Sequence, residues 1–162
     1  MPTENPLRTV SVKPPAKLSI VVVSPKTRTP KNKTGLARKL VTKKIETNYA
    51  VLNVGRASAI ALGFAKGDID LIGSGMEDAI AEPHRESLVP GYRAVKSAAL
   101  AAHASGVAIS GAGPSVVAFV DKTKHDPRKI GKVMVREFSK NKVESTFFVT
   151  SLAGGARIIR SE

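Results

Sequence analysis

The apolar residues of the chain follow two spacings, one typical of strands and one typical of helices. Four short runs rich in Val and Ile predict strands, because β-branched side chains suit the pleated surface of a buried sheet. The second and third runs are separated only by Gly111-Ala112-Gly113-Pro114, so these two strands are predicted to form an antiparallel hairpin. The four runs are residues 18–24, 107–110, 115–120 and 145–152.

Helices are predicted where apolar positions recur three or four residues apart. The clearest is the last one, in which Pro127 suits the first turn and Ile130, Val133, Met134 and Phe138 form one stripe. The predicted helices are residues 33–45, 48–66, 68–81, 92–104 and 127–140.

Residues with special backbone preferences mark the ends of these helices. Thr34 is placed to cap the first helix. Gly67 is placed to end the second helix, and Asp68 to cap the third. Prolines at Pro83 and Pro90 predict that the chain forms a loop before the helix that begins at residue 92.

The order of these elements predicts an α+β fold. With the inserted helices set aside, the chain follows the order strand, helix, strand, strand, helix, strand, which is the split βαβ pattern of a ferredoxin-like sandwich. Residues 1–17 contain four prolines and no helical period, so we expect an extended N-terminal arm or inter-domain tail ahead of one domain at residues 18–162. This architecture serves enzymes, regulatory domains and RNA binders alike, so it does not identify a function.

Composition narrows the class of protein. Aromatic residues make up 4% of the chain and Trp is absent, so the core must rest on Val, Ile, Leu and Ala. The absence of Cys excludes disulfides, thiolate metal ligands and a thiol nucleophile. We expect a cytoplasmic location, because no apolar run predicts export or a membrane span. The three histidines, His84, His103 and His125, share no metal-ligand spacing, so no metal site is predicted.

The charge of the chain is strongly positive, with a formal value of +13. Residues 1–46 carry eleven Lys or Arg against two Glu, while residues 67–86 carry six acids against Arg85 alone. Such a basic surface attracts polyanions, including nucleic acid and nucleotide triphosphates. The alternative is solvated lysine that serves solubility only, and any nucleic-acid binding is expected to be non-specific.

The turn at the centre of the hairpin is a candidate anion site. Gly111, Ala112 and Gly113 leave its edge bare, so backbone N–H groups can approach another molecule closely. Consecutive exposed N–H groups of this kind form an anion-binding concavity. The alternative interpretation is that the glycines and the following proline simply permit the hairpin.

Three local patterns occur in order along the chain: KTGLAR at residues 33–38, MEDAIAEPHRESLVPGY at residues 76–92, and GVAISGAGPSVVAFVD at residues 106–121. The string GGARII at residues 154–159 is a weaker fourth. Together they resemble the C-terminal half of the homoserine kinases, a branch of the GHMP small-molecule kinase family, over residues 6–159. The EPHR-LVPGY segment and the SGAGPS turn are the specific parts of this resemblance.

One signature of that family does not occur in the chain. GHMP kinases hold ATP with a Gly-Leu-Gly-Ser-Ser-Ala-like loop that opens a helix, whose backbone amides bind the triphosphate. The nearest string, at residues 35–38, lacks the serines. The resemblance therefore implies a substrate-side C-terminal domain whose partner is an absent ATP-binding N-terminal half, either a separate chain or a truncated part. ATP and Mg²⁺ are expected to be bound mainly by that half, and a homodimer is left open.

The resemblance also assigns roles to individual residues. It places Thr34 beside the reacting hydroxyl of homoserine and assigns Arg38 and Arg85 to binding of this substrate. A planar guanidinium suits this role because it can hold a carboxylate through two hydrogen bonds. The structural alternatives are that Thr34 is a plain N-cap, and that Arg85 is a surface residue paired with Glu82 or Glu86.

The resemblance gives the turn Gly111, Ala112 and Gly113 a supporting role, in which it packs against the phosphate loop of the other half. Three neighbouring acids, Glu77, Asp78 and Glu82, are expected to form a solvated helix face rather than a cation site.

Other functions remain open at this stage. One is another GHMP kinase, such as a mevalonate-pathway or shikimate-type member, although the EPHR-LVPGY segment favours homoserine. A second is a regulatory amino-acid-binding module. A third is a nucleic-acid binder, which stacks bases on aromatic residues of the sheet, but the hairpin strands offer only Phe119 for this purpose.

Overall fold

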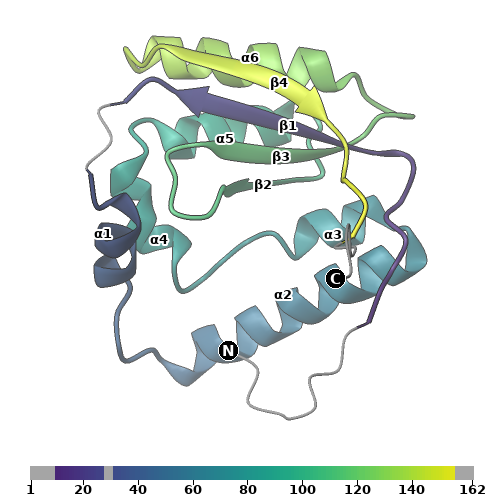
Figure 1. The fold of residues 1–162 in the computed structure, drawn as a ribbon, viewed down its shortest axis with the longest axis horizontal. Helices are drawn as coiled ribbons and strands as arrows, with labels where there is room; N and C mark the ends of the chain where they lie inside the picture. The colour runs from purple at the N-terminus through teal and green to yellow at the C-terminus, as the bar shows by residue number, and fades with distance from the viewer. Residues whose placement is uncertain (1–9, 28–30, 156–162) are drawn as a thin grey trace, which may run out of the picture.

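The protein is described by a computed structural model over residues 10–27 and 31–155. Four strands form one antiparallel sheet in the order β2-β3-β1-β4 (Figure 1). This order and the antiparallel hairpin confirm the α+β, ferredoxin-like prediction. The strands are β1 (Leu18–Pro25), β2 (Gly106–Ile109), β3 (Val116–Asp121) and β4 (Ser145–Thr150).

Two helices, α5 (Tyr92–Ala101) and α6 (Pro127–Lys140), cover one face of the sheet. In β1 the alternating residues Val21 and Val23 point toward these helices and are fully buried, as expected for a strand with one covered face. The main core cluster includes Val107, Val116, Ala118, Val120, Val95, Ala99, Ile130, Met134 and Phe138. The predicted stripe of α6 is confirmed except at Val133, which is only half-buried.

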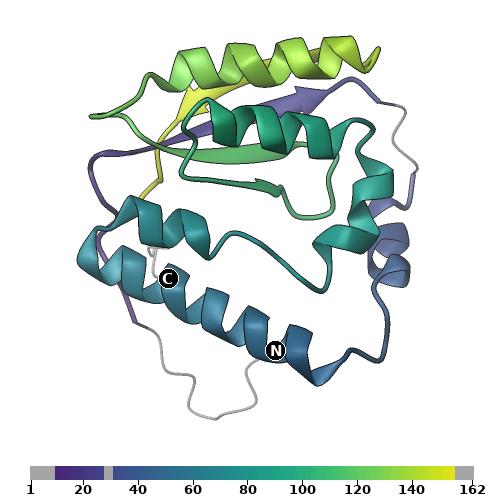
Figure 2. The same cartoon turned by 180° about the vertical axis from the view of Figure 1, so that it is seen from behind.

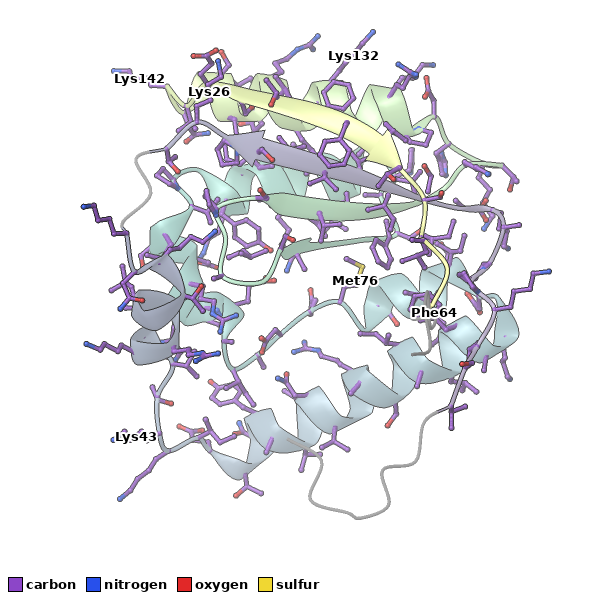
Figure 3. The ribbon with its side chains drawn as sticks, in the orientation of Figure 1. Lys26, Lys43, Phe64, Met76, Lys132 and Lys142 are labelled. Carbon is purple, nitrogen blue, oxygen red and sulfur yellow. The ribbon has the colours of Figure 1, made fainter. Side chains whose placement is uncertain are left out.

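A second layer lies beyond the β2 edge of the sheet (Figures 1 and 2). It consists of the long helix α2 (Thr47–Lys66) and the short helix α3 (Ile69–Ser74), which contacts β2. The backbones approach closely here, because a Cβ added to Gly73 would lie 1.9 Å from the carbonyl oxygen of Ser105. Met76, just after α3, lies between this layer and β2 (Figure 3).

The remaining helices are α1 (Lys33–Leu40) and α4 (Glu82–Arg85), followed by a 3₁₀ turn, η1 (Glu86–Leu88). Residues 82–88 are therefore helical, and the prediction of a loop there was wrong. Pro83 lies in the first turn of α4, where a missing backbone N–H removes no helical hydrogen bond.

Several helices end earlier than predicted. α1 stops at Leu40 rather than residue 45, α5 stops at Ala101 rather than residue 104, and α3 stops at Ser74 rather than residue 81. Residues 78–81 do not continue the helix. The carboxylate of Asp78 accepts hydrogen bonds from the backbone N–H groups of Ile80 and Ala81, which a continuing helix would direct to its own carbonyls.

The predicted caps at the α2–α3 junction are confirmed. Gly67 adopts a left-handed conformation with φ of 69°, and the Asp68 side chain accepts a hydrogen bond from the backbone N–H of Leu71. Among the described residues no helix has both the length and the apolar composition needed to cross a bilayer. The predicted GGARII pattern falls mostly outside the described residues, from Ala156 onward.

Candidate functional site

The three segments that carry the predicted site residues lie together at one end of the sheet (Figures 1 and 2). α1 packs against α4, and α4 packs against β2 near the turn that joins β2 to β3. These segments are far apart in the sequence, so the fold rather than local spacing assembles this end of the molecule.

α1 begins with a side-chain cap at Asn32. The Asn32 Oδ1 accepts a hydrogen bond of 3.1 Å from the backbone N–H of Gly35. The prediction that Thr34 caps this helix was therefore wrong, because Thr34 lies inside the first turn. Its hydroxyl is left available for another role.

Thr34 and Arg38 are four residues apart on α1 and so lie on the same face of the helix. Both are exposed. Within residues 10–27 and 31–155, Arg38 forms no ion pair, although it lies in a strongly basic segment. An exposed guanidinium without an ion pair retains its full capacity to bind an anion.

Arg85 is the last residue of α4, and its side chain points to the hairpin turn. Its Nη1 donates a hydrogen bond of 3.1 Å to the carbonyl oxygen of Gly111. Its Nε is buried and lacks a hydrogen-bond partner among the described residues. The alternative that Arg85 pairs with Glu82 or Glu86 was wrong.

The two candidate partners of Arg85 are held by other cations. Glu82 forms an ion pair with Lys96, and Glu86 forms one with Arg93 over 2.5 Å. Both carboxylates that the sequence offered as partners of Arg85 are thus paired elsewhere, and the donors of Arg85 other than its buried Nε remain available to a ligand.

The turn between β2 and β3 contains two glycines in the left-handed region. Gly111 has φ of 57° and Gly113 has φ of 71°, which side chains other than glycine adopt only with strain. A Cβ at Gly113 would also meet Val89 at 3.2 Å, whereas a Cβ at Gly111 would meet nothing within 4 Å. Both packing and backbone conformation therefore favour glycine at residue 113. Gly111 borders open space, and Ala112 between them is half-buried.

The prediction of an acidic helix face was wrong, because Glu77 and Asp78 lie outside the helices and Glu82 is buried, although Glu77 is exposed as expected. Glu77 lies after the end of α3 and pairs with Arg56 over 2.7 Å. Glu82 is only 8% exposed. Burial acts to raise the pKa of Asp78, but hydrogen bonds from Asn53 and two backbone amides, with the nearby charge of Arg85, hold it below its ordinary value.

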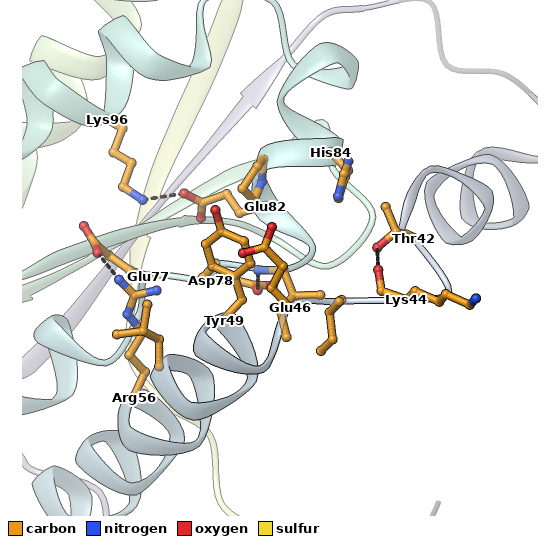
Figure 4. A pocket seen from close by; sticks show the side chains of 15 residues that line it. Thr42, Lys44, Glu46, Tyr49, Arg56, Glu77, Asp78, Glu82, His84 and Lys96 are labelled. Carbon is orange, nitrogen blue, oxygen red and sulfur yellow. Dashed lines mark hydrogen bonds and ion pairs between the residues drawn. The ribbon is translucent and has the colours of Figure 1, made fainter.

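A cleft with a volume of about 640 Å³ opens next to α4 (Figure 4). Its walls come from residues 42–46, the first turns of α2, residues 77–84 and Lys96. Tyr49, Leu52 and Lys96 were not predicted as site residues, because they belong to helices whose sequence carries no catalytic motif. Thr34, Arg38 and Arg85 do not line this cleft, although His84 beside Arg85 does.

The histidines show no joint metal site. His103 and His125 stack with ring centroids 4.6 Å apart, while His84 belongs to the cleft. Within the part of the chain that the structure describes, no group of three His, Cys, Asp or Glu side chains could hold a metal ion.

The family to which the chain belongs is identified by comparison with known proteins. Residues 60–140, half of the chain, match the family described as "GHMP kinases C terminal". The chain therefore belongs to the GHMP kinase family, as a C-terminal domain.

Individual relatives agree with this membership. The chain is 38% identical over 158 residues to the homoserine kinase of Chlorobaculum tepidum and 38% identical over 153 residues to that of Pyrococcus furiosus. These matches cover 96% and 94% of this chain but only 48% and 49% of the relatives. The chain thus spans about half the length of the curated relatives that it matches.

Solved structures extend the comparison. The homoserine kinase from Cytophaga hutchinsonii superposes with a TM-score of 0.82 at 34% identity, over 91% of this chain and 46% of that one. A phosphomevalonate kinase from Streptococcus pneumoniae gives a TM-score of 0.55 at 17% identity, over 87% of this chain and 42% of that one. The second likeness shows a shared fold only.

Proposed function

We propose that this chain is the substrate-side part of a homoserine kinase, which transfers a phosphoryl group from ATP to the hydroxyl of homoserine. The observation that carries the proposal is the contact between Arg85 and Gly111. It holds beside a glycine turn with a bare edge an arginine that forms no ion pair within residues 10–27 and 31–155, and α1 with Arg38 packs against the same helix.

Each proposed role follows from the chemistry of the acceptor. Homoserine carries a carboxylate, an ammonium and a hydroxyl that must face the phosphoryl donor. Arg38 and Arg85 would hold the carboxylate, since guanidinium groups bind carboxylates with two parallel hydrogen bonds. Thr34 would fix the direction of the reacting hydroxyl from the same face of α1. Phosphoryl transfer depends mainly on such positioning and on charge stabilisation.

Binding of ATP and Mg²⁺ is assigned to the other half of the kinase. Of the acids near the site, Glu77 pairs with Arg56 and Glu82 pairs with Lys96. The carboxylate of Asp78 accepts hydrogen bonds from backbone N–H groups. When bound, ATP supplies the phosphoryl group. The turn at Gly111, Ala112 and Gly113 would then support the phosphate-binding loop by close backbone approach.

The test is reconstitution. The complementary half of the Chlorobaculum tepidum homoserine kinase, the part that this chain does not match, is joined to this chain and assayed for ATP-dependent phosphorylation. We expect homoserine to be phosphorylated and mevalonate to be left unchanged, and we expect no transfer by the chain alone. Preference for mevalonate over homoserine, or homoserine phosphorylation by the isolated chain, would contradict the proposal.

A further inference from the structure

Three carboxylates lie near Arg85, and each of them is held by a different group. Asp78 interacts with the charge of Arg85, but its carboxylate accepts hydrogen bonds from an amide side chain and from two backbone N–H groups. Glu82 and Glu86 each pair with a basic residue of α5. A guanidinium among three acids is ordinarily neutralised, so the groups that hold these acids decide whether Arg85 can bind a ligand.

Glu82 is the strongest competitor for Arg85 among these acids. The two residues are three positions apart on α4, a spacing at which side chains are neighbours, and an acid that precedes a base is the favoured order on a helix. The side chain of Glu82 is only 10% exposed. At such a site opposite charges attract each other more strongly than in water, and a carboxylate without a partner is costly.

Lys96 is the residue that holds Glu82. It extends from α5, and its ammonium group pairs with the Glu82 carboxylate at the wall of the cleft (Figure 4). The side chain of Lys96 is 17% exposed, and its Nζ lies 5.8 Å from the centre of the buried Tyr92 ring. The pair is therefore largely shielded from water and attached to a helix of the core.

Among the described residues that line the cleft, the other Lys and Arg side chains do not replace this ammonium group. Arg56 pairs with Glu77 over 2.7 Å. Lys44 is exposed and extends away from Glu82 (Figure 4). If Lys96 loses its charge, the cation left within reach of Glu82 is Arg85, one turn further along the same helix.

We propose that Lys96 is a positioning residue for the acceptor, because its ion pair with Glu82 keeps the guanidinium of Arg85 available to the substrate carboxylate. This inference rests on the proposed function, in which Arg85 binds that carboxylate. Without the ammonium group of Lys96, Glu82 pairs with Arg85 and competes with the substrate for the same donors. Lys96 itself does not touch the substrate.

The experiment compares three variants in the reconstituted kinase: Lys96→Met, Glu82→Gln, and the double variant Lys96→Met/Glu82→Gln. In Lys96→Met we expect the KM for homoserine to rise about tenfold or more, with the KM for ATP nearly unchanged, because a charge-assisted contact to the substrate is lost. In Glu82→Gln and in the double variant we expect the KM for homoserine to stay close to the wild-type value, because no carboxylate then competes for Arg85.

A purely structural role of the ion pair predicts a different pattern. If the pair only holds α4 in place, Glu82→Gln and the double variant raise the KM for homoserine as much as Lys96→Met does, and the inference is overturned. An unchanged KM in Lys96→Met also overturns it. The matched control is Arg93→Met, which breaks the ion pair between Glu86 and the 81% exposed Arg93 and should leave the KM unchanged. An equal rise in Arg93→Met and Lys96→Met contradicts the inference.

A second measurement follows Arg85 directly and does not depend on activity. The Nε–H of Arg85 is observed by NMR in the ¹⁵N-labelled chain, and its signal is assigned by its loss in Arg85→Lys. We expect this signal to shift in Lys96→Met and to return toward its wild-type position in the double variant. Circular dichroism and thermal melting verify that the variants fold. If Lys96→Met does not fold, Lys96→Gln takes its place, since it keeps a hydrogen-bond donor for Glu82 but no charge.

The two measurements separate the inference from the proposed function. If the Arg85 signal shifts and returns as expected but the reconstituted kinase does not phosphorylate homoserine, the competition for Glu82 is supported and the proposed activity is overturned. If homoserine is phosphorylated and neither the KM nor the Arg85 signal responds to Lys96→Met, the inference alone is overturned.

Discussion

Arg85 donates a hydrogen bond of 3.1 Å from Nη1 to the carbonyl oxygen of Gly111, across 26 residues of sequence. This contact ties α4 to the turn between β2 and β3. It uses only one of the five donors of the guanidinium, so the side chain is held in direction while the donors other than the buried Nε can bind a ligand. Rigid placement of a binding group from two elements lowers the entropy lost when the substrate binds.

The first prediction concerns Arg85 in the reconstituted kinase. Arg85→Lys keeps the charge but loses the planar fork, so the hydrogen bonds to the homoserine carboxylate are weakened. We expect the KM for homoserine to rise about tenfold to a hundredfold, from a loss of roughly 1.5–3 kcal/mol, while the KM for ATP stays nearly unchanged. Steady-state kinetics with each substrate varied in turn measure both constants.

Arg93→Lys is the control for this substitution. Arg93 is 81% exposed and pairs with Glu86, and an exposed ion pair contributes little. If the two lysine variants shift the KM for homoserine equally, Arg85 is not a substrate-binding residue.

The second prediction separates capping from catalysis on α1. Asn32→Ala removes the side chain that caps the helix, so the free energy of unfolding should fall by roughly 0.5–2 kcal/mol. Thr34→Val removes only a hydroxyl that makes no cap, so the stability should change little while kcat/KM for homoserine falls. Urea unfolding and steady-state kinetics on the same samples distinguish a structural role of Thr34 from a catalytic one. A large stability loss from Thr34→Val with unchanged kinetics would return Thr34 to a structural role.

The third prediction concerns the two glycines of the hairpin turn. Gly113→Ala should destabilise the protein more than Gly111→Ala, although both have positive φ. Each substitution carries a left-handed strain of about 1–2 kcal/mol, and only the Cβ at residue 113 also presses on Val89. Differential scanning calorimetry on both variants measures the difference. Equal melting temperatures would show that the turn relaxes away from Val89.

The sequence predicted the fold well for elements that have one apolar face and one polar face, because the apolar face must pack against the core. The α6 stripe faces the core because its opposite face is charged, and the strands pair as their short connection requires. The sequence did not separate buried from exposed positions on α2, because every face of that helix is apolar. Burial there depends on which segment packs against it, and local spacing contains no such information.

The candidate site was predicted in part for the same reason. The motifs identified Arg85 and the glycine turn, but their contact depends on α4, where Pro83 and Pro90 had predicted a loop instead of a helix. The non-helical conformation of residues 78–81 was not predicted, because Asp78 binds the backbone amides of Ile80 and Ala81, and the spacing of apolar residues does not reveal a side-chain hydrogen bond of this kind.

The fourth prediction is a pH dependence of stability that arises from Asp78. The pKa of Asp78 is lowered in the folded protein from its ordinary value of 3.8. The ionised carboxylate therefore stabilises the fold at pH values above about 4, and this contribution is lost as the pH falls through the lower, folded-state pKa. Asp78→Asn should be less stable than the wild type at pH 7, and the difference should shrink toward pH 3. Urea unfolding at both values tests this; a difference that grows on acidification would contradict it.

The last prediction concerns the positive charge. Arg128, Lys132, Arg136 and Lys140 recur every four residues along the exposed face of α6, and Lys132 points away from the sheet (Figure 3). The opposite face of the sheet carries Phe119 and Phe148 but no Lys or Arg on its strands, so it lacks the cations that line single-strand grooves.

Duplex DNA should therefore bind weakly, without sequence preference, and through α6. Because such binding releases counterions from phosphates, its affinity should fall steeply with salt, and Lys132→Glu/Arg136→Glu should reduce the slope of log affinity against log salt by about two. Fluorescence anisotropy between 50 and 200 mM salt measures this, with Thr146→Glu/Thr150→Glu on β4 as the matched control. Sequence-selective binding that persists at the upper salt concentration and is lost in the β4 variant would favour a nucleic-acid-binding module over a kinase domain.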